Sequence, residues 1–190
     1  MKDTRSQLIS SMKELLWERG YDATSPNQVL ERSGAGKGSF YHHFSGKQEL
    51  AIAAMDERAN ELIAEFELIF HSDQHWLDKL ENYLLQPRDG LKGCRIGRIA
   101  QDPSMDELLL RVPLKRYFSQ LQQAIEQLLN QAKDKGELPE SICAHTLSCT
   151  VISTVQGGFV MSRALYDPDC INMACQGLID LLRTLSTLKT

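Results

Sequence analysis

Apolar residues recur every three or four positions along most of this 190-residue chain, the spacing that places them on one face of an α-helix. Glycine interrupts the pattern at positions typical of helix ends, such as Gly20 and Gly136. Pro87, Gly90 and Gly93 break the helical pattern in the middle of the chain. The pattern predicts an all-α fold, with helices over residues 4–20, 47–70, 76–85, 106–135, 141–165 and 167–188.

Two shorter helices are predicted between residues 25 and 44, on either side of the turn Gly34-Ala35-Gly36. Ser25 fits an N-cap, Pro26 the first helical position, and Gln28 the position that closes a capping box. A supporting helix, a tight glycine-containing turn and a second short helix are the parts of a helix-turn-helix.

The second of these helices, over residues 37–44, has two faces of different character. Phe40 and Phe44 stand four residues apart, so we expect both rings to face the core. The remaining surface carries a cation, a hydroxyl, a phenol and two imidazoles, and none of these groups is favourable to bury. Such a helix fits the recognition helix of a DNA-binding protein. The residues concerned are Lys37, Ser39, Tyr41, His42 and His43.

The stretch G-A-G-K-G-S-F-Y-H-H-F-S-G-K-Q-E-L, residues 34–50, closely resembles the signature of TetR-type transcriptional repressors. The resemblance is strong over Leu8–Leu50, and the rest of the chain agrees with the family in length and helical pattern. Gly36, Ser33 and Leu30 depart from the signature, which usually has Ser or Thr, Ala and Ala there. Glycine still serves as an N-cap, weaker than serine by roughly a few tenths of a kcal/mol.

The resemblance implies an N-terminal three-helix DNA-binding domain over residues 1–47 and a larger helical domain for ligand binding and dimerisation over 48–190. In the family the last two helices form a homodimer interface. Two-fold symmetry then requires a palindromic operator in double-stranded DNA, with half-sites about one turn, roughly 34 Å, apart. A small-molecule inducer or an electrophile would release the repressor from that operator.

The residues of the helix-turn-helix divide into two expected roles on DNA. Tyr41 and Lys47 should bind phosphates, with Ser25 and His43 as helpers. Base edges should be reached by Lys37, Ser39 and His42, where a lysine favours guanine. The predicted DNA-binding set is Ser25, Lys37, Gly38, Ser39, Tyr41, His42, His43 and Lys47.

A second informative segment, G-C-R-I-G-R-I-A-Q-D, covers residues 93–102. If it is helical from Cys94, the thiol lies at a helix N-terminus with Arg98 one turn later, and both effects favour the thiolate. The segment resembles G-C-x-x-G-x-x-x-Q in a subgroup of TetR-type repressors that respond to electrophiles or small unsaturated compounds, where the matching cysteine can be the sensor. The alternative is a small residue buried in a domain core, with Arg98 paired to Asp102, since free cysteine is often buried. The predicted inducer-site residues are Trp76, Tyr83, Cys94, Arg98, Gln101, Tyr117, Gln156 and Met161.

The net charge of −4 is unevenly divided along the chain. Residues 1–50 carry seven Lys and Arg against six Asp and Glu, whereas residues 51–190 carry fourteen against nineteen. The difference in net charge between the two parts has the sign expected for an N-terminal DNA-binding domain, but the difference is small. Local placement of Lys37 and Lys47 must therefore supply the attraction to phosphate.

Several other classes of protein are disfavoured. No signal peptide and no apolar run of membrane-spanning length is present, and five cysteines without a C-x-x-C pair suit reduced thiols, so we expect a cytoplasmic protein without a membrane partner. The sequence His71-Ser-Asp-Gln-His75 offers two imidazoles, but a solvated turn explains it better than a metal site. No metal and no cofactor are predicted.

Two competing functions stand beside the repressor. An enzyme with Cys94 as nucleophile needs a nearby base, and no motif places His71, His75 or His145 in that role, so the chain is predicted not to be an enzyme. A protein of the same fold that acts as an activator or an adaptor remains open.

The stretch G-A-G-K-G-S lacks the spacing of a phosphate-binding loop. Glu31 stands where that loop requires its first Gly, and Gly38 stands where it requires Ser or Thr.

Overall fold

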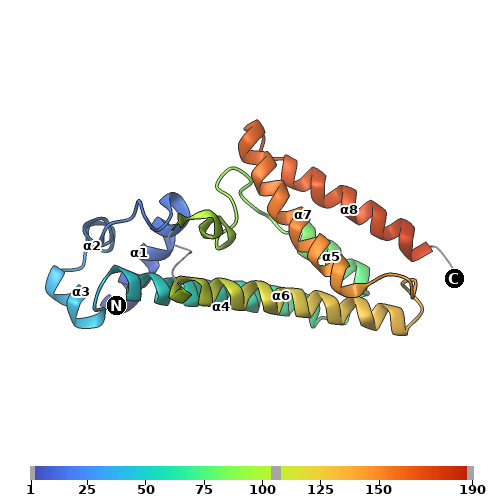
Figure 1. The fold of residues 1–190 in the computed structure, drawn as a ribbon, viewed down its shortest axis with the longest axis horizontal. Helices are drawn as coiled ribbons and strands as arrows, with labels where there is room; N and C mark the ends of the chain where they lie inside the picture. Colours follow the sequence, from blue (N-terminus) through green and yellow to red (C-terminus); the bar gives the residue numbers. More distant parts are fainter. Residues whose placement is uncertain (1–2, 104–107, 188–190) are drawn as a thin grey trace. The chain divides into compact units, whose positions relative to one another are not determined.

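The computed structural model describes residues 3–103 and 108–187, and every regular element in those ranges is a helix (Figure 1). The predicted all-α fold is therefore confirmed. The elements are α1 (Thr4–Arg19), α2 (Pro26–Ser33), α3 (Lys37–His43), α4 (Lys47–Phe70), α5 (Trp76–Leu85), the 3-10 helix η1 (Gly97–Gln101), α6 (Leu108–Asp134), α7 (Ala144–Leu165) and α8 (Cys170–Thr187).

Helix boundaries follow the predicted signals closely, except that α7 and α8 each begin three residues later than predicted. α4 and α5 have the predicted limits, and Gly20, at φ 84°, ends α1. α7 begins at Ala144 rather than Ser141, because the chain first makes a turn in which Ile142 N donates to the carbonyl oxygen of Pro139 at 3.0 Å. α8 begins at Cys170 rather than Asp167, because the chain first makes a turn in which Asp169 N donates to Asp167 Oδ1 at 3.0 Å. The predicted start of α6 at Asp106 and the predicted end of α8 at Leu188 lie outside the described residues.

The chain groups into two compact units. The first contains Met1–Glu61 and Arg95–Tyr117, and the second contains Leu62–Cys94 and Phe118–Thr190. α4 and α6 each contribute residues to both units. The predicted domain boundary after residue 47 falls within the first unit.

The core of the first unit collects apolar side chains from every helix that reaches it. α1 supplies five of them, so it forms the floor for the helix-turn-helix as its periodicity predicts. The start of α4 contributes the next largest share, and η1 and α6 contribute one each. The buried residues are Leu8, Ile9, Met12, Leu15, Leu16, Val29, Phe40, Phe44, Leu50, Ala51, Ala54, Met55, Ile99 and Leu110.

The second unit buries the apolar stripes of α5, α7, α8 and the later part of α6. Gly158 of α7 meets α8 closely, since a Cβ atom there would lie 2.8 Å from Ile171 Cα. Of the glycine pair in the middle of α7, Gly158 is the member that permits this approach. No helix in residues 3–103 and 108–187 is long and apolar enough to cross a membrane.

Candidate functional site

The first helix of the helix-turn-helix is fixed at both ends by local hydrogen bonds. Ser25 Oγ accepts from Gln28 N at 3.3 Å, and Ser25 N donates to Gln28 Oε1 at 2.8 Å, so the predicted capping box is present. At the other end Gly34 adopts the left-handed conformation, φ 69° and ψ 10°, and donates to the carbonyl oxygen of Leu30. These contacts fix the direction in which the chain leaves α2.

The turn itself is held by Ser33. Its Oγ donates to the carbonyl oxygen of Leu30 at 3.2 Å and accepts from Ala35 N at 3.2 Å. Gly36 is the N-cap of α3 and provides no side-chain hydrogen bond, as the substitution of the usual Ser or Thr implies. The packing of α3 must therefore compensate for a weak cap.

Two phenylalanines provide that packing. Phe40 is fully buried and Phe44 is 3% exposed, with ring centroids 6.3 Å apart, as predicted. Tyr41 is 55% exposed, and its ring makes an edge contact with the Phe40 ring, with the centroids 5.0 Å apart. Of the other predicted DNA-binding residues on α3, Lys37, Gly38 and His42 are exposed, and Ser39 and His43 are half-buried.

Lys47 begins α4, four residues after α3 ends at His43. Its Nζ is 4.0 Å from the centroid of the Tyr21 ring, a cation–π contact that restricts the ammonium while leaving N–H groups for another partner. Just before it, Ser45 N and Ser45 Oγ both donate to Glu49 Oε2 at 2.7 Å. The Ser45 hydrogen bonds lower the pKa of the Glu49 carboxyl.

Tyr21 and Glu49 were missed by sequence reasoning. The Ser45–Glu49 pair has a local signal, because a serine before the first helical residue and a glutamate in the first turn are typical of a helix start. Tyr21 has none, since its contact with Lys47 joins residues that only the fold brings together.

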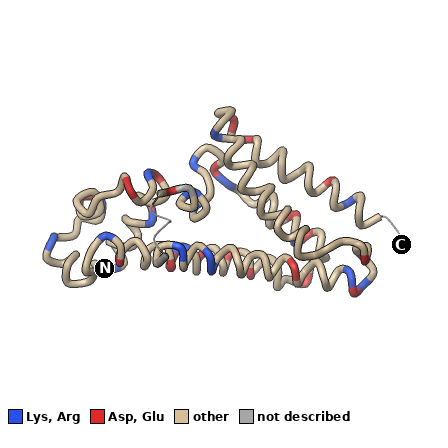
Figure 2. The backbone as a smooth tube through the Cα atoms, viewed as in Figure 1, with Lys and Arg blue, Asp and Glu red and all other residues tan. Residues whose placement is uncertain are grey.

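The exposed surface of the helix-turn-helix is basic despite the acidic chain. Residues 25–47 include three Lys or Arg and one Glu, and Figure 2 marks the charged residues along the tube. Arg5 adds a further exposed guanidinium, 5.4 Å from the Phe44 ring. A cation, a phenol and two imidazoles on one short helix, with further cations on the neighbouring helices, suit contact with a phosphate backbone and base edges.

The second unit contains two of the predicted inducer-site aromatics. Trp76 is 4% exposed, and its Nε1 is buried with no hydrogen-bond partner among the described atoms. Tyr83 is 3% exposed, its ring lies 5.5 Å from that of Phe70, and burial raises the pKa of its phenol. An unpaired indole N–H in an apolar interior costs free energy unless an acceptor is supplied.

Cys94 does not lie at a helix N-terminus. The segment forms η1, which begins only at Gly97, and Gly93 adopts φ 90°, so the predicted helix from Cys94 is wrong. Arg98 Nη1 donates to the carbonyl oxygen of Trp17 at 2.6 Å. Cys94 is half-buried and belongs to the second unit, whereas Arg98 belongs to the first.

The other predicted inducer-site residues are spread over both units. Tyr117 is buried in the first unit, and the backbone of Gln101 closes η1, while its side chain lies outside the described part of the structure. Gln156 is half-buried on α7, and Met161, also on α7, is 50% exposed.

The histidine turn between α4 and α5 has structural contacts. His75 Nδ1 accepts from Leu77 N at 3.3 Å and caps α5, while His75 Nε2 is 3.3 Å from Glu137 Oε2. His71 Nδ1 lies 3.0 Å from the carbonyl oxygen of Glu67. Among the described residues no group of three or more His, Cys, Asp or Glu side chains is placed to hold a metal ion.

Two family profiles match the chain. The profile of the bacterial regulatory proteins of the tetR family matches residues 8–54, and that of the tetracyclin repressor-like C-terminal domain matches residues 74–178. The first covers the helix-turn-helix and the start of α4, and the second runs from before α5 into α8.

Individual relatives agree with the profiles. An uncharacterised helix-turn-helix transcriptional regulator from the lacX 3′ region of Lactococcus lactis subsp. lactis is 25% identical over 97% of this chain and 93% of its own. The transcriptional repressor DhaR of Mycobacterium sp. (strain GP1) is 22% identical over 84% and 82%. The crystal structure of a TetR-family regulator from Cytophaga hutchinsonii superposes with a TM-score of 0.86 at 19% identity, over 98% of this chain and 96% of that one. The shared fold extends over both units.

Proposed function

Because this chain belongs to the TetR family of bacterial regulatory proteins, we propose that it is a homodimeric repressor released from a palindromic operator by an inducer. Members of the family are DNA-binding transcriptional regulators, a class without enzymatic activity, so the prediction that the chain is not an enzyme is confirmed. The observation that carries the proposal is the exposed polar face of α3, held on the core by Phe40 and Phe44. A cytoplasmic location is part of the proposal.

The proposed DNA contacts follow from which side chains α3 and α4 expose. The Tyr41 hydroxyl and the Lys47 ammonium bind phosphates, assisted by Ser25 and His43. Lys37, at the first position of α3, enters the major groove with Ser39, His42 and Gly38, whose missing side chain permits close approach of the backbone. The proposed DNA-binding set is Ser25, Lys37, Gly38, Ser39, Tyr41, His42, His43 and Lys47.

The proposed dimer interface is the apolar face of α7 and α8. On α7, Gly157, Met161 and Leu165 are spaced by four residues and share one helical face, and Met161 and Leu165 are at least half exposed. α8 repeats the pattern with Met173 and Leu181 around a central glycine, Gly177. Exposed apolar rows of this kind are stabilised by burial against a second copy, and the glycines allow close approach of its helices.

The proposed inducer site centres on Trp76 and Tyr83 in the second unit. The buried Trp76 Nε1 has no partner among the described atoms, so an inducer with an acceptor oxygen would satisfy it. Such a ligand shifts the equilibrium toward the DNA-incompetent state only by the difference between its affinities for the two states.

Cys94 is the proposed covalent position if the inducer is an electrophile. Its partial exposure supports access, although a helix N-terminus does not activate it. Cys143 is a competing thiol, because it is exposed and hydrogen bonding with Thr146 lowers its pKa. Burial raises the pKa of Cys170 and of Cys175, so these thiols should react slowly.

The test is binding of the purified protein to a promoter fragment from its own genomic neighbourhood, with and without a thiol-reactive enal. The parent protein carries Cys143→Ser and Cys149→Ser, which remove the two exposed thiols, and is compared with Cys94→Ser in the same background. Release of the parent but not of the Cys94→Ser protein supports the covalent sensor. Tight binding that the enal leaves unchanged keeps the repressor and removes Cys94 from sensing. Absence of binding to this fragment and to DNA selected from random sequence would contradict the repressor.

A further inference from the structure

The turn that follows α1 is held by a segment from much later in the chain. Asp102 Oδ2 accepts from Tyr21 N at 2.7 Å and from Asp22 N at 3.4 Å. Arg98 Nη1 donates to the carbonyl oxygen of Trp17 at 2.6 Å. All three bonds lie within the first unit, so these charge-assisted hydrogen bonds join the segment Arg95–Asp102 to the last turn of α1 and to the turn that follows it.

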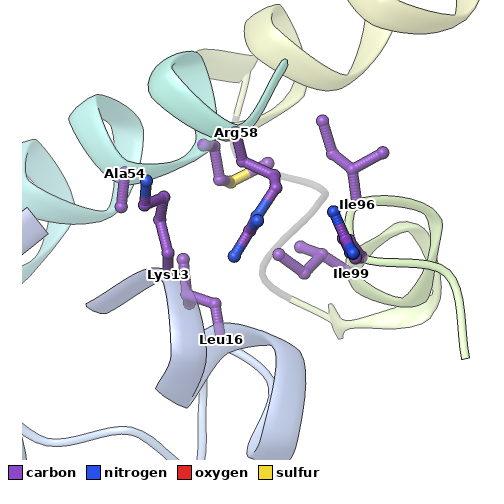
Figure 3. Close-up of a pocket in the computed structure, with 8 residues that line it drawn as sticks. Lys13, Leu16, Ala54, Arg58, Ile96 and Ile99 are labelled. Carbon is purple, nitrogen blue, oxygen red and sulfur yellow. The ribbon is translucent and has the colours of Figure 1, made fainter. Parts of the chain in front are cut away.

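Packing holds the same segment against α1 and α4. Ile96 is fully buried and Ile99 is 2% exposed. Both side chains line a cavity of about 10 Å³, with room for one water molecule at most. Leu16 of α1 and Ala54 of α4 line the same cavity, and Figure 3 shows these residues. Because the segment has little space to move, the position of Asp102 relative to α1 is well defined.

Tyr21 joins this segment to the DNA-binding surface. Its backbone N–H is held by Asp102, and its ring carries the Lys47 ammonium at 4.0 Å. Gly20 permits the arrangement, since it adopts φ 84° and a Cβ atom there would lie 2.7 Å from Asp102 Oδ2. A displacement of Asp102 would therefore shift the residue on which the ammonium rests.

We propose that Asp102 is a positioning residue for DNA binding, which holds Tyr21 so that the Tyr21 ring directs the Lys47 ammonium to a phosphate. The inference rests on the proposed function, because it requires that Lys47 contact DNA. It adds a residue far from the helix-turn-helix in sequence, in the segment that directly follows Cys94.

The sign of the effect separates positioning from simple electrostatics. Asp102 is a negative charge in the unit that binds DNA, so removing it would on charge alone strengthen binding to phosphate. Positioning predicts the opposite for Asp102→Ala, which loses the acceptor for Tyr21 N. Asp102→Asn keeps a carbonyl oxygen to accept that bond while losing the charge, so it should bind DNA at least as well as wild type.

The experiment measures affinity for a labelled duplex of random sequence by fluorescence anisotropy, over about 50 to 200 mM salt. Wild type, Asp102→Ala, Asp102→Asn, Lys47→Ala and the double variant Asp102→Ala/Lys47→Ala are compared. Lys47→Ala should lose about fivefold in affinity and about 0.9 in the slope of log K against log salt. Asp102→Ala should lose about threefold and part of the same slope, and it should have little further effect in the Lys47→Ala protein.

A matched control is Asp89→Ala. Asp89 Oδ1 accepts from Lys92 N at 2.9 Å, so this variant removes a similar carboxylate-to-backbone bond from a turn of the second unit. It should leave the salt slope unchanged. If Asp102→Ala does not fold, Tyr21→Leu replaces it, since leucine keeps the backbone N–H and the apolar bulk but removes the ring under Lys47.

Each outcome is decisive. Unchanged or increased affinity in Asp102→Ala would overturn the positioning role and leave the repressor intact. Effects of Asp102→Ala and Lys47→Ala that add fully would do so too. A normal salt slope in Tyr21→Leu would do the same. Wild-type protein without affinity for any duplex would overturn the proposed function together with this inference.

Discussion

Replacement of Gly158 by alanine tests how closely α7 and α8 approach. A Cβ atom at this position would lie 2.8 Å from Ile171 Cα, 2.9 Å from Ile171 Cγ1 and 3.1 Å from Ile171 Cβ. The nearest of these atoms belongs to the backbone of α8, so no rotation of a side chain can relieve the contact. Gly157, one residue earlier in the same helix, is the natural control, because a methyl group added there would meet nothing within 4 Å.

Two opposing effects set the expected magnitude. Alanine is favoured over glycine in a helix interior by about 1 kcal/mol, which both variants gain. Overpacking costs about 1–3 kcal/mol, which only Gly158→Ala suffers. The two variants should therefore differ by about 2 kcal/mol in their free energy of unfolding. For a chain of this size that difference corresponds to about 6 °C in Tm.

Thermal and urea unfolding followed by circular dichroism measure the difference. Gly157 lies on the proposed dimer face, so sedimentation must first show that both variants keep the oligomeric state of wild type. Gly158→Ala should unfold at a lower temperature than Gly157→Ala. A Gly158→Ala protein as stable as its control would refute the close helix approach on which the estimate rests.

Further substitutions test the DNA-binding surface, the core beneath it and the proposed dimer interface. Tyr41→Phe should weaken DNA binding about fivefold without changing the slope of log K against log salt, because a neutral hydroxyl releases no counterion. Lys47→Ala should flatten that slope by about 0.9, and anisotropy titrations over a range of salt concentrations distinguish the two variants. Phe40→Ala should lower the free energy of unfolding by about 3–5 kcal/mol in urea titrations, since the ring is fully buried. Leu165→Asp should give monomers in sedimentation and lose operator affinity. Leu68→Asp is the control, because Leu68 lies on α4 and is more exposed than Leu165, and this variant should stay dimeric and keep its affinity.

The helix-turn-helix was predictable because its signals are local. Ser25 and Gln28 form their capping box within one turn, and Gly34 needs only its own backbone freedom to end α2. Phe40 and Phe44 identify the buried face of α3 by their spacing alone. The exposed face, and with it the DNA-binding residues, then follows from these positions.

The segment 93–102 was not predictable in the same way. Its isoleucines, Ile96 and Ile99, stand three residues apart, which fits one turn of a 3-10 helix as well as an α-helix. Its conformation is fixed by two long-range hydrogen bonds, which Arg98 donates to the carbonyl oxygen of Trp17 and Asp102 accepts from Tyr21 N. These contacts join residues 81 positions apart, and no local pattern reports them.

The late start of α7 has a similar cause on a smaller scale. The apolar spacing near Ile142 continues the helical pattern backwards, but the turn begun at Pro139 uses the backbone that a longer helix would need. Periodicity alone sets a helix boundary only to within a few residues.

The core of the first unit has a consequence for engineering chimaeric regulators. A graft that exchanges only residues 1–47 would remove α1–α3 from Leu50, Ala51 and Met55 of α4, which are buried in the same core, and from Ile99 of η1. The foreign helices would then meet an interface shaped for other side chains, at a cost of about 1–3 kcal/mol for each poor fit. To exchange DNA specificity, a chimaera should instead replace only the outward-facing residues of α3. Alternatively, it should transfer α1–α3 together with the start of α4 and residues 95–117.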